Sequence, residues 1–366
     1  MVLRGISPTR IVTTSGFDCI RSATEWLRYF AVMRTLVLGG TNFIGRAIVG
    51  ALIAAGDQPL VCHRGEHEPE DGPVSEVPHL HADRQDLGQV RSQLEDFGAE
   101  AVLDCLAMSR ASSQAVMDAL PDPSLRWVVL SSMDVYRAFA AIQHDTVSDA
   151  VPITETSPTR DDTHPYPEAK PEYSKLEVEE IVTERGGVIV RLPMVYGPYD
   201  YQLREEPILR RVRAGRTRIP VGAMNGTLPM AFVHDVARGV AAAVRTGGIE
   251  GEIFHLAEAQ VRPVDLWARQ VLSAAGSEAA LVQVEESLLP ADLGLFGTLR
   301  QPLVTDSSKA RRVLGYEDTP WEKAIAASVA WHLAHPPLDT DGKPSGDFAS
   351  DDAALTSVGA NAHVAT

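Results

Sequence analysis

The stretch TLVLGGTNFIGRAIVGALIAAG, residues 35–56, joins a short apolar run to a glycine-rich turn and then to an amphipathic segment. The run at 35–39 has the length and composition that predict a buried strand. A strand, a glycine-rich turn and a helix in this order are the context that a dinucleotide-phosphate loop requires. The stretch therefore predicts a Rossmann-type nucleotide-binding fold. The apolar residues expected on the inner face of the helix are Phe43, Ile44, Ile48, Val49 and Leu52.

The alternation of apolar runs with amphipathic segments continues along the chain from Met33, which predicts an α/β fold with a doubly wound parallel sheet. Near-continuous apolar strands are typical of a sheet that helices cover on both faces. The expected strands are 35–39, 59–62, 101–106, 127–131 and 188–192, and the expected helical segments lie near 43–55, 87–97, 111–120 and 171–185.

After VYGPYD (195–200) the pattern loosens, and a strand is expected at 251–257 that returns to the main sheet. The other residues of this part predict a smaller, mostly helical lobe that binds the substrate. The expected divisions are a poorly ordered N-terminal extension at 1–32, an NAD(P)-binding Rossmann domain at 33–200 to which 230–257 returns, a substrate lobe at 201–336 and a disordered acidic tail at 337–366.

Composition narrows the choice of partners for this chain of 366 residues. A net charge of −16 argues against nucleic acid and anionic membranes as partners, because both require a concentrated basic face. Cys19, Cys62 and Cys105 are far apart and show neither disulfide nor zinc spacing, which fits a reducing cytoplasm and predicts no metal site. No apolar run approaches the ~18 residues that a membrane span needs.

The glycine-rich turn predicts where a cofactor diphosphate would bind. Gly39 would make the turn, and Gly45 would let the helix pack closely on the strand. The diphosphate would then lie on the free backbone N–H groups at the helix N-terminus, beside Thr41, Phe43 and Ile44. Asn42 stands at the middle glycine position, where we expect it to adopt a positive φ. The alternative is a turn with a purely structural role.

The end of the second strand bears on the choice between NAD and NADP. Arg64 follows that strand in PLVCHRGEHEP, and the nearest carboxylate, Glu66, lies beyond a glycine. An arginine here accommodates a 2′-phosphate, which favours NADP(H), although a solvated loop arginine would give the same sequence. After the third strand, HADRQDL supplies Asp83 and Arg84, which are placed to contact the adenine.

Five motifs, GGTNFIG, ADRQD, LSSMDVY, YSKLEVEE and VRLPMVYGPYD, together resemble the extended short-chain dehydrogenase/reductases, the NAD(P)-dependent epimerase/dehydratase group. The resemblance covers about residues 33–335, and the glycine-rich turn is most similar to that of atypical members. It implies hydride transfer at a carbinol or carbonyl carbon of a small or nucleotide-sugar-like substrate. It also implies a homodimer formed through two helices of the nucleotide-binding domain.

In this family a Ser or Thr hydrogen-bonds the reacting oxygen, a Tyr moves its proton, and a Lys holds the nicotinamide ribose. Ser132 and Lys175 match two of these positions, but the residue four before Lys175 is Pro171, which has no proton to donate. A proline there predicts that a helix starts near it. Tyr173 is then the candidate acid/base, or else it only packs under the substrate lobe. Tyr166 would lie in the preceding loop as a solvent-exposed decoy.

The resemblance implies further contacts around these residues. Leu106 and Pro193 would touch the cofactor, and Asp134 and Tyr136 would face the substrate. Dehydratases carry an Asp-Glu pair after the serine position, whereas here the pair is Met133 and Asp134, which counts against 4,6-dehydration. The alternative is that Asp134 only caps the end of the strand with its carboxylate.

Two functions remain open on the sequence. The first is an NAD(P)-dependent epimerase or carbonyl reductase, which the intact turn, Ser132 and Lys175 favour. The second is a non-catalytic NADP-binding module, because some atypical relatives have lost the tyrosine and act as sensors, and one branch binds RNA. Pro171 favours this second class, and the acidic charge argues against its RNA-binding branch.

Overall fold

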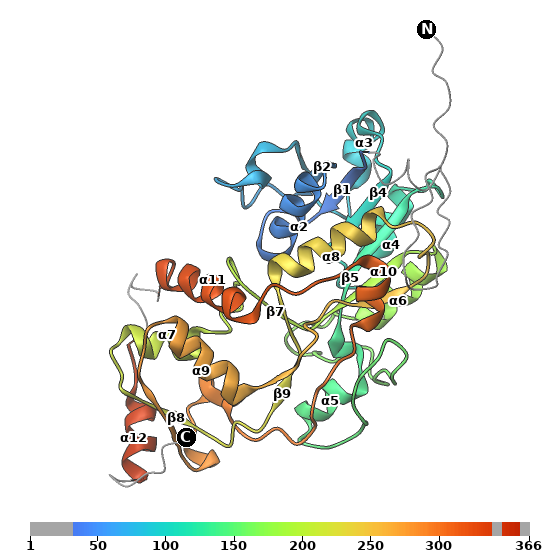
Figure 1. Cartoon of the computed structure of the whole chain (residues 1–366). Helices are drawn as coiled ribbons and strands as arrows, with labels where there is room; N and C mark the ends of the chain where they lie inside the picture. Colours follow the sequence, from blue (N-terminus) through green and yellow to red (C-terminus); the bar gives the residue numbers. More distant parts are fainter. Residues whose placement is uncertain (1–31, 339–345, 359–366) are drawn as a thin grey trace, which may run out of the picture. The chain divides into compact units, whose positions relative to one another are not determined.

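A parallel sheet forms the centre of the computed structural model, which describes residues 32–338 and 346–358. Its strand order is β11-β6-β5-β4-β1-β2-β3, so the direction of winding reverses between β1 and β4 (Figure 1). In such sheets ligands bind at the carboxyl ends of the strands near this point. The strands are β1 (Arg34–Leu38), β2 (Gln58–His63), β3 (His79–His81), β4 (Ala101–Asp104), β5 (Arg126–Ser132), β6 (Val188–Leu192) and β11 (Ile253–His255).

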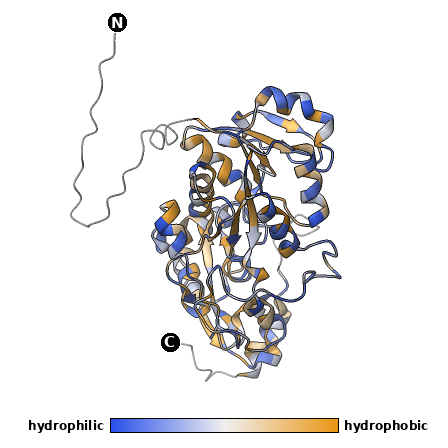
Figure 2. Ribbon diagram, turned by 90° about the vertical axis from the view of Figure 1, so that its right-hand side faces the viewer, coloured by the Kyte–Doolittle hydropathy of each residue, from blue (hydrophilic) through white to orange (hydrophobic). Residues whose placement is uncertain are grey.

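Helices cover both faces of the sheet. Because successive strand residues point to opposite sides, each strand contributes side chains to two hydrophobic cores. Val37 packs in one core with α2 and α8, which lie side by side, whereas Leu36 and Leu38 pack in a second core with α3, α4 and α6. Figure 2 shows the strands as mostly hydrophobic. The Rossmann-type fold expected from the sequence is confirmed. The helices around the sheet are α2 (Phe43–Ala54), α3 (Arg91–Phe97), α4 (Arg110–Ala119), α6 (Lys175–Glu184), α8 (Val233–Arg245) and α10 (Ser308–Leu314).

The expected helical C-terminal portion is present, with small sheets between its helices. The pairs are β7 (Met194–Tyr196) with β10 (Met230–Phe232), β8 (Arg218–Val221) with β13 (Ala280–Gln283), and β9 (Thr227–Leu228) with β12 (Arg262–Pro263). The remaining helices are α5 (Arg137–Gln143), α7 (Glu206–Arg213), α9 (Val264–Ala274), α11 (Trp321–Ala334) and α12 (Ala349–Ser357). Short 3-10 helices are η1 (Pro73–Glu76), η2 (Leu87–Val90), η3 (Met133–Val135), η4 (Glu286–Leu288) and η5 (Ala291–Phe296).

Two expectations about the elements were wrong. The helix predicted to start near Pro171 begins only at Lys175, because residues 171–174 form a turn and an irregular segment first. The tail predicted to be disordered contains α12, which is held by the bidentate contact of buried Arg211 with Asp351, at 2.7 Å for both bonds. Residues 339–345 and 359–366 of the expected tail, and all but the last residue of the extension at 1–32, lie outside the described residues.

The strand expected within 251–257 does return to the main sheet, where β11 pairs with β6. Residues of the expected substrate lobe belong to the same compact unit as the sheet. Within the described ranges, no helix is both long enough and apolar enough to cross a bilayer.

Candidate active site

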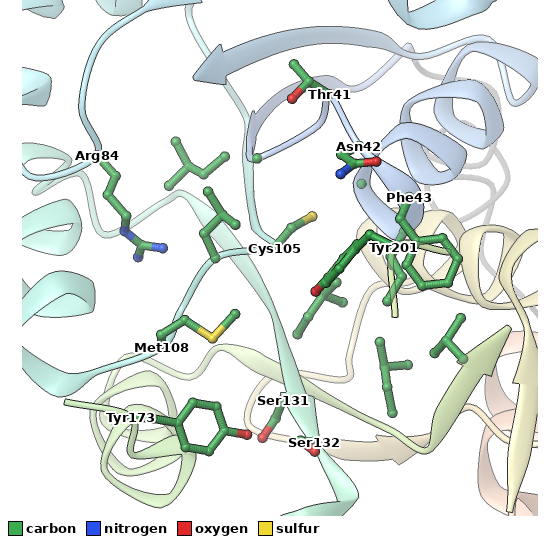
Figure 3. A pocket seen from close by; sticks show the side chains of 18 of the residues that line it. Thr41, Asn42, Phe43, Arg84, Cys105, Met108, Ser131, Ser132, Tyr173 and Tyr201 are labelled. Atoms are coloured by element: carbon green, nitrogen blue, oxygen red, sulfur yellow. The ribbon is translucent and has the colours of Figure 1, made fainter. Parts of the chain in front are cut away.

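A cavity of about 800 Å³ lies over the carboxyl ends of the central strands, and residues that follow β1, β2, β4, β5 and β6 line it. Figure 3 shows Phe43 and Tyr201 beside each other on one side, Arg84 across the cavity, and the Tyr173 hydroxyl directed toward Ser131 and Ser132. One cavity thus brings together nearly all the residues singled out in the sequence. Those that line it are Gly39, Thr41, Asn42, Phe43, Ile44, Arg64, Asp83, Arg84, Leu106, Ser132, Asp134, Tyr173, Lys175 and Pro193.

The glycine-rich turn has the close contacts that a phosphate loop needs. A Cβ on Gly39 would lie 2.4 Å from the Leu106 side chain, and a Cβ on Gly45 would lie 2.1 Å from the Gly39 carbonyl oxygen. The positive φ expected at Asn42 is wrong: Asn42 is extended with φ −132°, and Phe43 takes the left-handed conformation with φ 38°. The positive φ angles of this turn therefore fall on Gly39, with φ 84°, and on the first residue of α2.

The N-terminus of α2 is open toward the cavity. Among the described residues, no side chain caps this end of the helix, and no acidic residue lies in its first turn. The first N–H groups of a helix have no partner within the helix, and the helix dipole adds partial positive charge there. Together with the tight glycine contacts, this end fits the diphosphate of a nicotinamide dinucleotide.

At the end of the cavity beside β2 and β3, Arg64 and Arg84 are each paired with a carboxylate. Arg64 and Glu66 form an exposed ion pair of 2.8 Å, and both line the cavity. Arg84 donates hydrogen bonds of 2.9 and 2.5 Å to the buried carboxylate of Asp104 at the end of β4. Asp104 also accepts a bond of 2.8 Å from the N–H of Leu106. Asp104 therefore fixes both Arg84 and the start of the loop after β4, a role that the sequence did not reveal.

A histidine cluster borders this end of the cavity. His63, Glu68 and His79 bring ligand atoms within 4.8 Å of one another, which raises the possibility of a metal site. The N–H of Gly65 donates to Nδ1 of His63, so the proton of that ring lies on Nε2, 2.8 Å from Nδ1 of His79. His79 in turn donates from Nε2 to the Val74 carbonyl at 2.8 Å. The two imidazoles form an ordered hydrogen-bonded chain, and a metal ion would have to displace the proton between them.

At the opposite end, two tyrosines converge on one carboxylate. The hydroxyl of Tyr173 donates to Oδ2 of Asp134 at 2.7 Å, and that of Tyr166 donates to the same oxygen at 3.2 Å. The Asp134 N–H donates to the Ser132 hydroxyl at 3.2 Å. Burial first, and the Asp134 charge second, raise the pKa of Tyr173 well above its ordinary range. The expectation of an exposed decoy is wrong for Tyr166, which is half-buried and lines the cavity.

Lys175 is a buried residue that lines the same cavity. Its Nζ donates to the carbonyl of Ala107 at 2.6 Å and to that of Leu130 at 2.9 Å. An ammonium group has three N–H donors, so these two carbonyls leave one donor for a group in the cavity. Burial lowers the pKa of Lys175 to about 8, although Asp104 and Asp134 oppose this shift.

Tyr136 does not reach the cavity, which corrects its expected contact with the substrate. Its side chain is fully buried, and its hydroxyl is bonded to His255 Nε2 at 2.5 Å and to Arg191 at 2.6 Å. Tyr136 directly follows the turn η3 and packs into the hydrophobic core. Arg191 also forms a buried ion pair of 2.6 Å with Glu179, which ties α6 to β6.

Tyr201 and Gln202 follow 195–200, where the hydrophobic pattern is weak, and the sequence did not predict that they line the cavity. Tyr201 lines the cavity with its ring edge-on to Phe43 at 6.0 Å between centroids. Gln202 and Arg204 also line it, and Asp200 holds Arg204 at 2.9 Å. Of the remaining lining residues, Cys105 and Met108 follow the end of β4, a position at which a parallel sheet presents ligand contacts.

Comparisons with known proteins agree with this geometry. Residues 35–257 match the model of the NAD dependent epimerase/dehydratase family. A solved UDP-glucose 4-epimerase is similar, with a TM-score of 0.66 and 17% identity over 83% of this chain and 98% of that chain. The Bordetella bronchiseptica enzyme WbmH, solved with NAD+, has a TM-score of 0.63 and 18% identity over 84% of this chain and 100% of that chain.

Two further proteins are similar. UDP-glucose 4-epimerase of Thermotoga maritima, solved with UDP-glucose, has a TM-score of 0.64 and 18% identity over 82% of this chain and 99% of that chain. The chloroplast stem-loop binding protein of 41 kDa b from Arabidopsis thaliana is 26% identical over 259 residues, or 66% of this chain. That match spans 63% of the plant protein. Since the family model covers more than half of the chain, the protein belongs to the NAD-dependent epimerase/dehydratase family.

Proposed function

We propose that the protein is an NAD(P)-dependent epimerase or reductase that acts at a carbinol or carbonyl carbon of a nucleotide-sugar-like substrate. One observation carries the proposal: the open N-terminus of α2 and the hydroxyl groups of Ser132 and Tyr173 line the same cavity. A phosphate-binding end and a proton-moving end within one cavity are what this chemistry requires.

The residues have the following proposed roles. The turn at Gly39 and the N-terminus of α2 bind the diphosphate, and Leu106 and Pro193 contact the nicotinamide. Lys175 binds the nicotinamide ribose through its remaining N–H donor. Ser132 donates a hydrogen bond to the reacting oxygen, and Tyr173 moves its proton. When bound, the dinucleotide supplies the acceptor or donor of the hydride.

The cofactor preference and the type of reaction are finer proposals. Arg64 supports NADP(H) over NAD(H), although its ion pair with Glu66 must open before it can bind a 2′-phosphate. Met133 supports epimerisation or reduction over 4,6-dehydration, because a thioether cannot act as an acid or base where dehydratases carry a carboxylate. A homodimer remains a prediction from the family resemblance.

The test is a panel of nucleotide sugars, including UDP-glucose and UDP-galactose, incubated with the protein and either NAD+ or NADP+ and followed by NMR. Formation of the epimer without consumption of added reductant supports an epimerase, and stoichiometric loss of added NAD(P)H with a carbonyl substrate supports a reductase. If neither reaction occurs while the dinucleotide raises the melting temperature, the proposed activity is wrong.

A non-catalytic nucleic-acid-binding protein is the second candidate, and the similarity to the plant stem-loop binding protein is the observation that favours it. The net charge of −16 opposes it, because binding to nucleic acid is driven largely by basic side chains. Binding of an RNA stem-loop at 0.15 M salt, measured by fluorescence anisotropy, would support this candidate. An affinity no better than that for unrelated RNA would exclude it.

A further inference from the structure

We infer that Asp134 is the proton partner of Tyr173: it receives the hydroxyl proton of Tyr173 as Tyr173 receives the proton of the substrate hydroxyl. The inference rests on the proposed function and deepens it. The base of the reaction would be a carboxylate that acts through a tyrosine, and Asp134 would be a positioning and proton-accepting residue that need not touch the substrate.

The geometry around Asp134 carries the inference. Its Oδ2 accepts the hydroxyl of Tyr173 at 2.7 Å, a distance typical of a strong bond to a charged acceptor. The same oxygen accepts Tyr166 at 3.2 Å, and the two tyrosine rings lie 5.4 Å apart. Asp134 is held by η3, whose first turn is capped by the Ser132 hydroxyl at 3.2 Å. The carboxylate is therefore aimed at Tyr173 from a fixed backbone.

Lys175 is less well placed to control the Tyr173 proton. The position one turn before Lys175 is Pro171, and Tyr173 lies outside α6, because that helix begins only at Lys175. Two of the Nζ donors of Lys175 are bound to the carbonyls of Ala107 and Leu130. In a tyrosine-lysine couple the positive charge lowers the pKa of the tyrosine. Here burial and Asp134 raise the pKa of Tyr173, so its hydroxyl stays protonated until a base accepts the proton.

The proton transfer is balanced without further reactants. The O–H bond of the substrate breaks and an O–H bond forms at Oη of Tyr173. At the same time the original O–H bond of Tyr173 breaks and one forms at Oδ2 of Asp134. The carboxylate loses its negative charge, the substrate oxygen gains one, and Tyr173 is neutral before and after. In the direction of reduction the two transfers run in reverse.

Several other groups surround this pair. Asp104 and Asp134 both interact with Lys175, and Arg160 interacts with Tyr166. Nζ of Lys170 lies 5.8 Å from the centroid of the Tyr173 ring. The charged and titratable groups that face Asp134 or its partners are Tyr166, Arg160, Lys170 and Tyr173 from the loop between α5 and α6, Lys175 and Glu179 from α6, Arg84 from the loop after β3, and Asp104 at the end of β4.

The first experiment needs no substrate. The full-length protein is labelled with 13C at Cζ of its tyrosines, and the chemical shift of each tyrosine is followed by NMR as pH rises, with NAD+ present. The resonance that disappears in Tyr173→Phe belongs to Tyr173. We expect Tyr173 to remain protonated up to pH 10 in the wild type, and Asp134→Asn to increase its ionisation constant at least tenfold. Asp149→Asn is the matched control, because that carboxylate binds Arg137 at 2.6 Å and does not line the cavity. An unchanged Tyr173 titration in Asp134→Asn would overturn the inference.

The second experiment separates the relay from a tyrosine-lysine couple, with a nucleotide sugar that the wild type converts. The relay predicts that Asp134→Asn lowers kcat by ~10²–10⁴-fold, removes the acidic limb of the pH profile, and adds nothing to the loss in Tyr173→Phe. A tyrosine-lysine couple predicts the opposite, since removal of a negative charge near Tyr173 helps it to ionise, and an equal or higher kcat would overturn the relay. If the wild type converts no nucleotide sugar, the proposed function fails. The titration then still decides whether the hydrogen bond to Asp134 controls the ionisation of Tyr173.

Discussion

Lys175 lines the cavity, and its ammonium group donates to the carbonyl of Ala107 in the loop after β4 and to that of Leu130 in β5. A buried lysine loses hydration energy in its charged form, which lowers its pKa. Because of this burial, the free energy of unfolding should rise with pH above about 8.

The first prediction concerns this pH dependence. The pKa of Lys175 is about 8 when folded and ~10.4 when unfolded, so between these values the unfolded chain binds more protons. The free energy of unfolding should rise as pH rises from 8 toward 10, by up to ~3 kcal/mol, and fall as pH returns to 8. Lys175→Met should remove this rise in urea denaturation, and Lys323→Met, at an exposed lysine, should keep it. The same slope in Lys175→Met and wild type contradicts this account.

The second prediction concerns Arg64 and Glu66, whose ion pair lies at the far end of the cavity. Arg64→Ala should weaken NADP+ binding about tenfold and leave NAD+ binding unchanged, because one charge-assisted bond to the 2′-phosphate is lost. Glu66→Gln should strengthen NADP+ binding, since the arginine no longer has a competing partner. Isothermal titration calorimetry measures both, with Arg110→Ala as the control at an exposed ion pair outside the cavity. Equal losses for both cofactors in Arg64→Ala would refute the role of Arg64.

At the scale of elements, α2 offers a comparison between two glycines of one helix. A Cβ at Gly45 would lie 2.1 Å from the Gly39 carbonyl oxygen, whereas a Cβ at Gly50 would meet nothing within 4 Å. Gly45→Ala should therefore displace the phosphate turn, cost ~1–3 kcal/mol of stability and abolish measurable NAD+ binding. Gly50→Ala should stabilise the protein by ~0.5–1 kcal/mol and bind NAD+ normally. Thermal melts with and without NAD+ test both, and normal binding by Gly45→Ala would show that the turn is not a phosphate site.

Helix α12 provides the fourth prediction. Arg211 is fully buried and contacts both Asp351 and Asp292. Asp351→Asn should lower the free energy of unfolding by about 3 kcal/mol, because it leaves a buried guanidinium only partly compensated. Asp352→Asn is the matched control, since that carboxylate is mostly exposed, and it should cost less than about 1 kcal/mol. Urea denaturation gives both values. Equal effects would mean that α12 is not held by its buried charge pair.

The elements that could be predicted from the sequence are those with a clear hydrophobic period. The strands β1, β2, β4, β5, β6 and β11 and the helices α2, α3 and α4 lie within a few residues of their expected ranges, because apolar side chains facing two cores dominate their sequences. Helix α12 had no such signal, since its docking depends on the contact between Asp351 and Arg211, which lie far apart in the sequence. The late start of α6 was also missed, because a proline is compatible with a first helical turn but does not require one.

At the scale of the whole molecule, the cavity was predictable where parallel topology brings the ends of strands together. Arg64 and Leu106, which follow β2 and β4, and Ser132, at the end of β5, line the cavity, as expected for residues at the ends of parallel strands. Tyr136 was misplaced because this expectation does not say where a turn points the next side chain. The convergence of Tyr166 and Tyr173 on Asp134 was missed because it depends on how a long loop folds back over the sheet.

The most direct measurement mixes the NAD+- or NADP+-loaded protein with the nucleotide-sugar panel in a stopped-flow spectrometer and follows absorbance at 340 nm. The account predicts a rise as the substrate is oxidised, which decays again if the enzyme is an epimerase, and predicts that Tyr173→Phe loses the rise while it binds the dinucleotide normally. No change at 340 nm for any substrate, with the dinucleotide bound, would contradict the account and leave a binding protein. A full signal in Tyr173→Phe would contradict the assignment of the reacting end of the cavity.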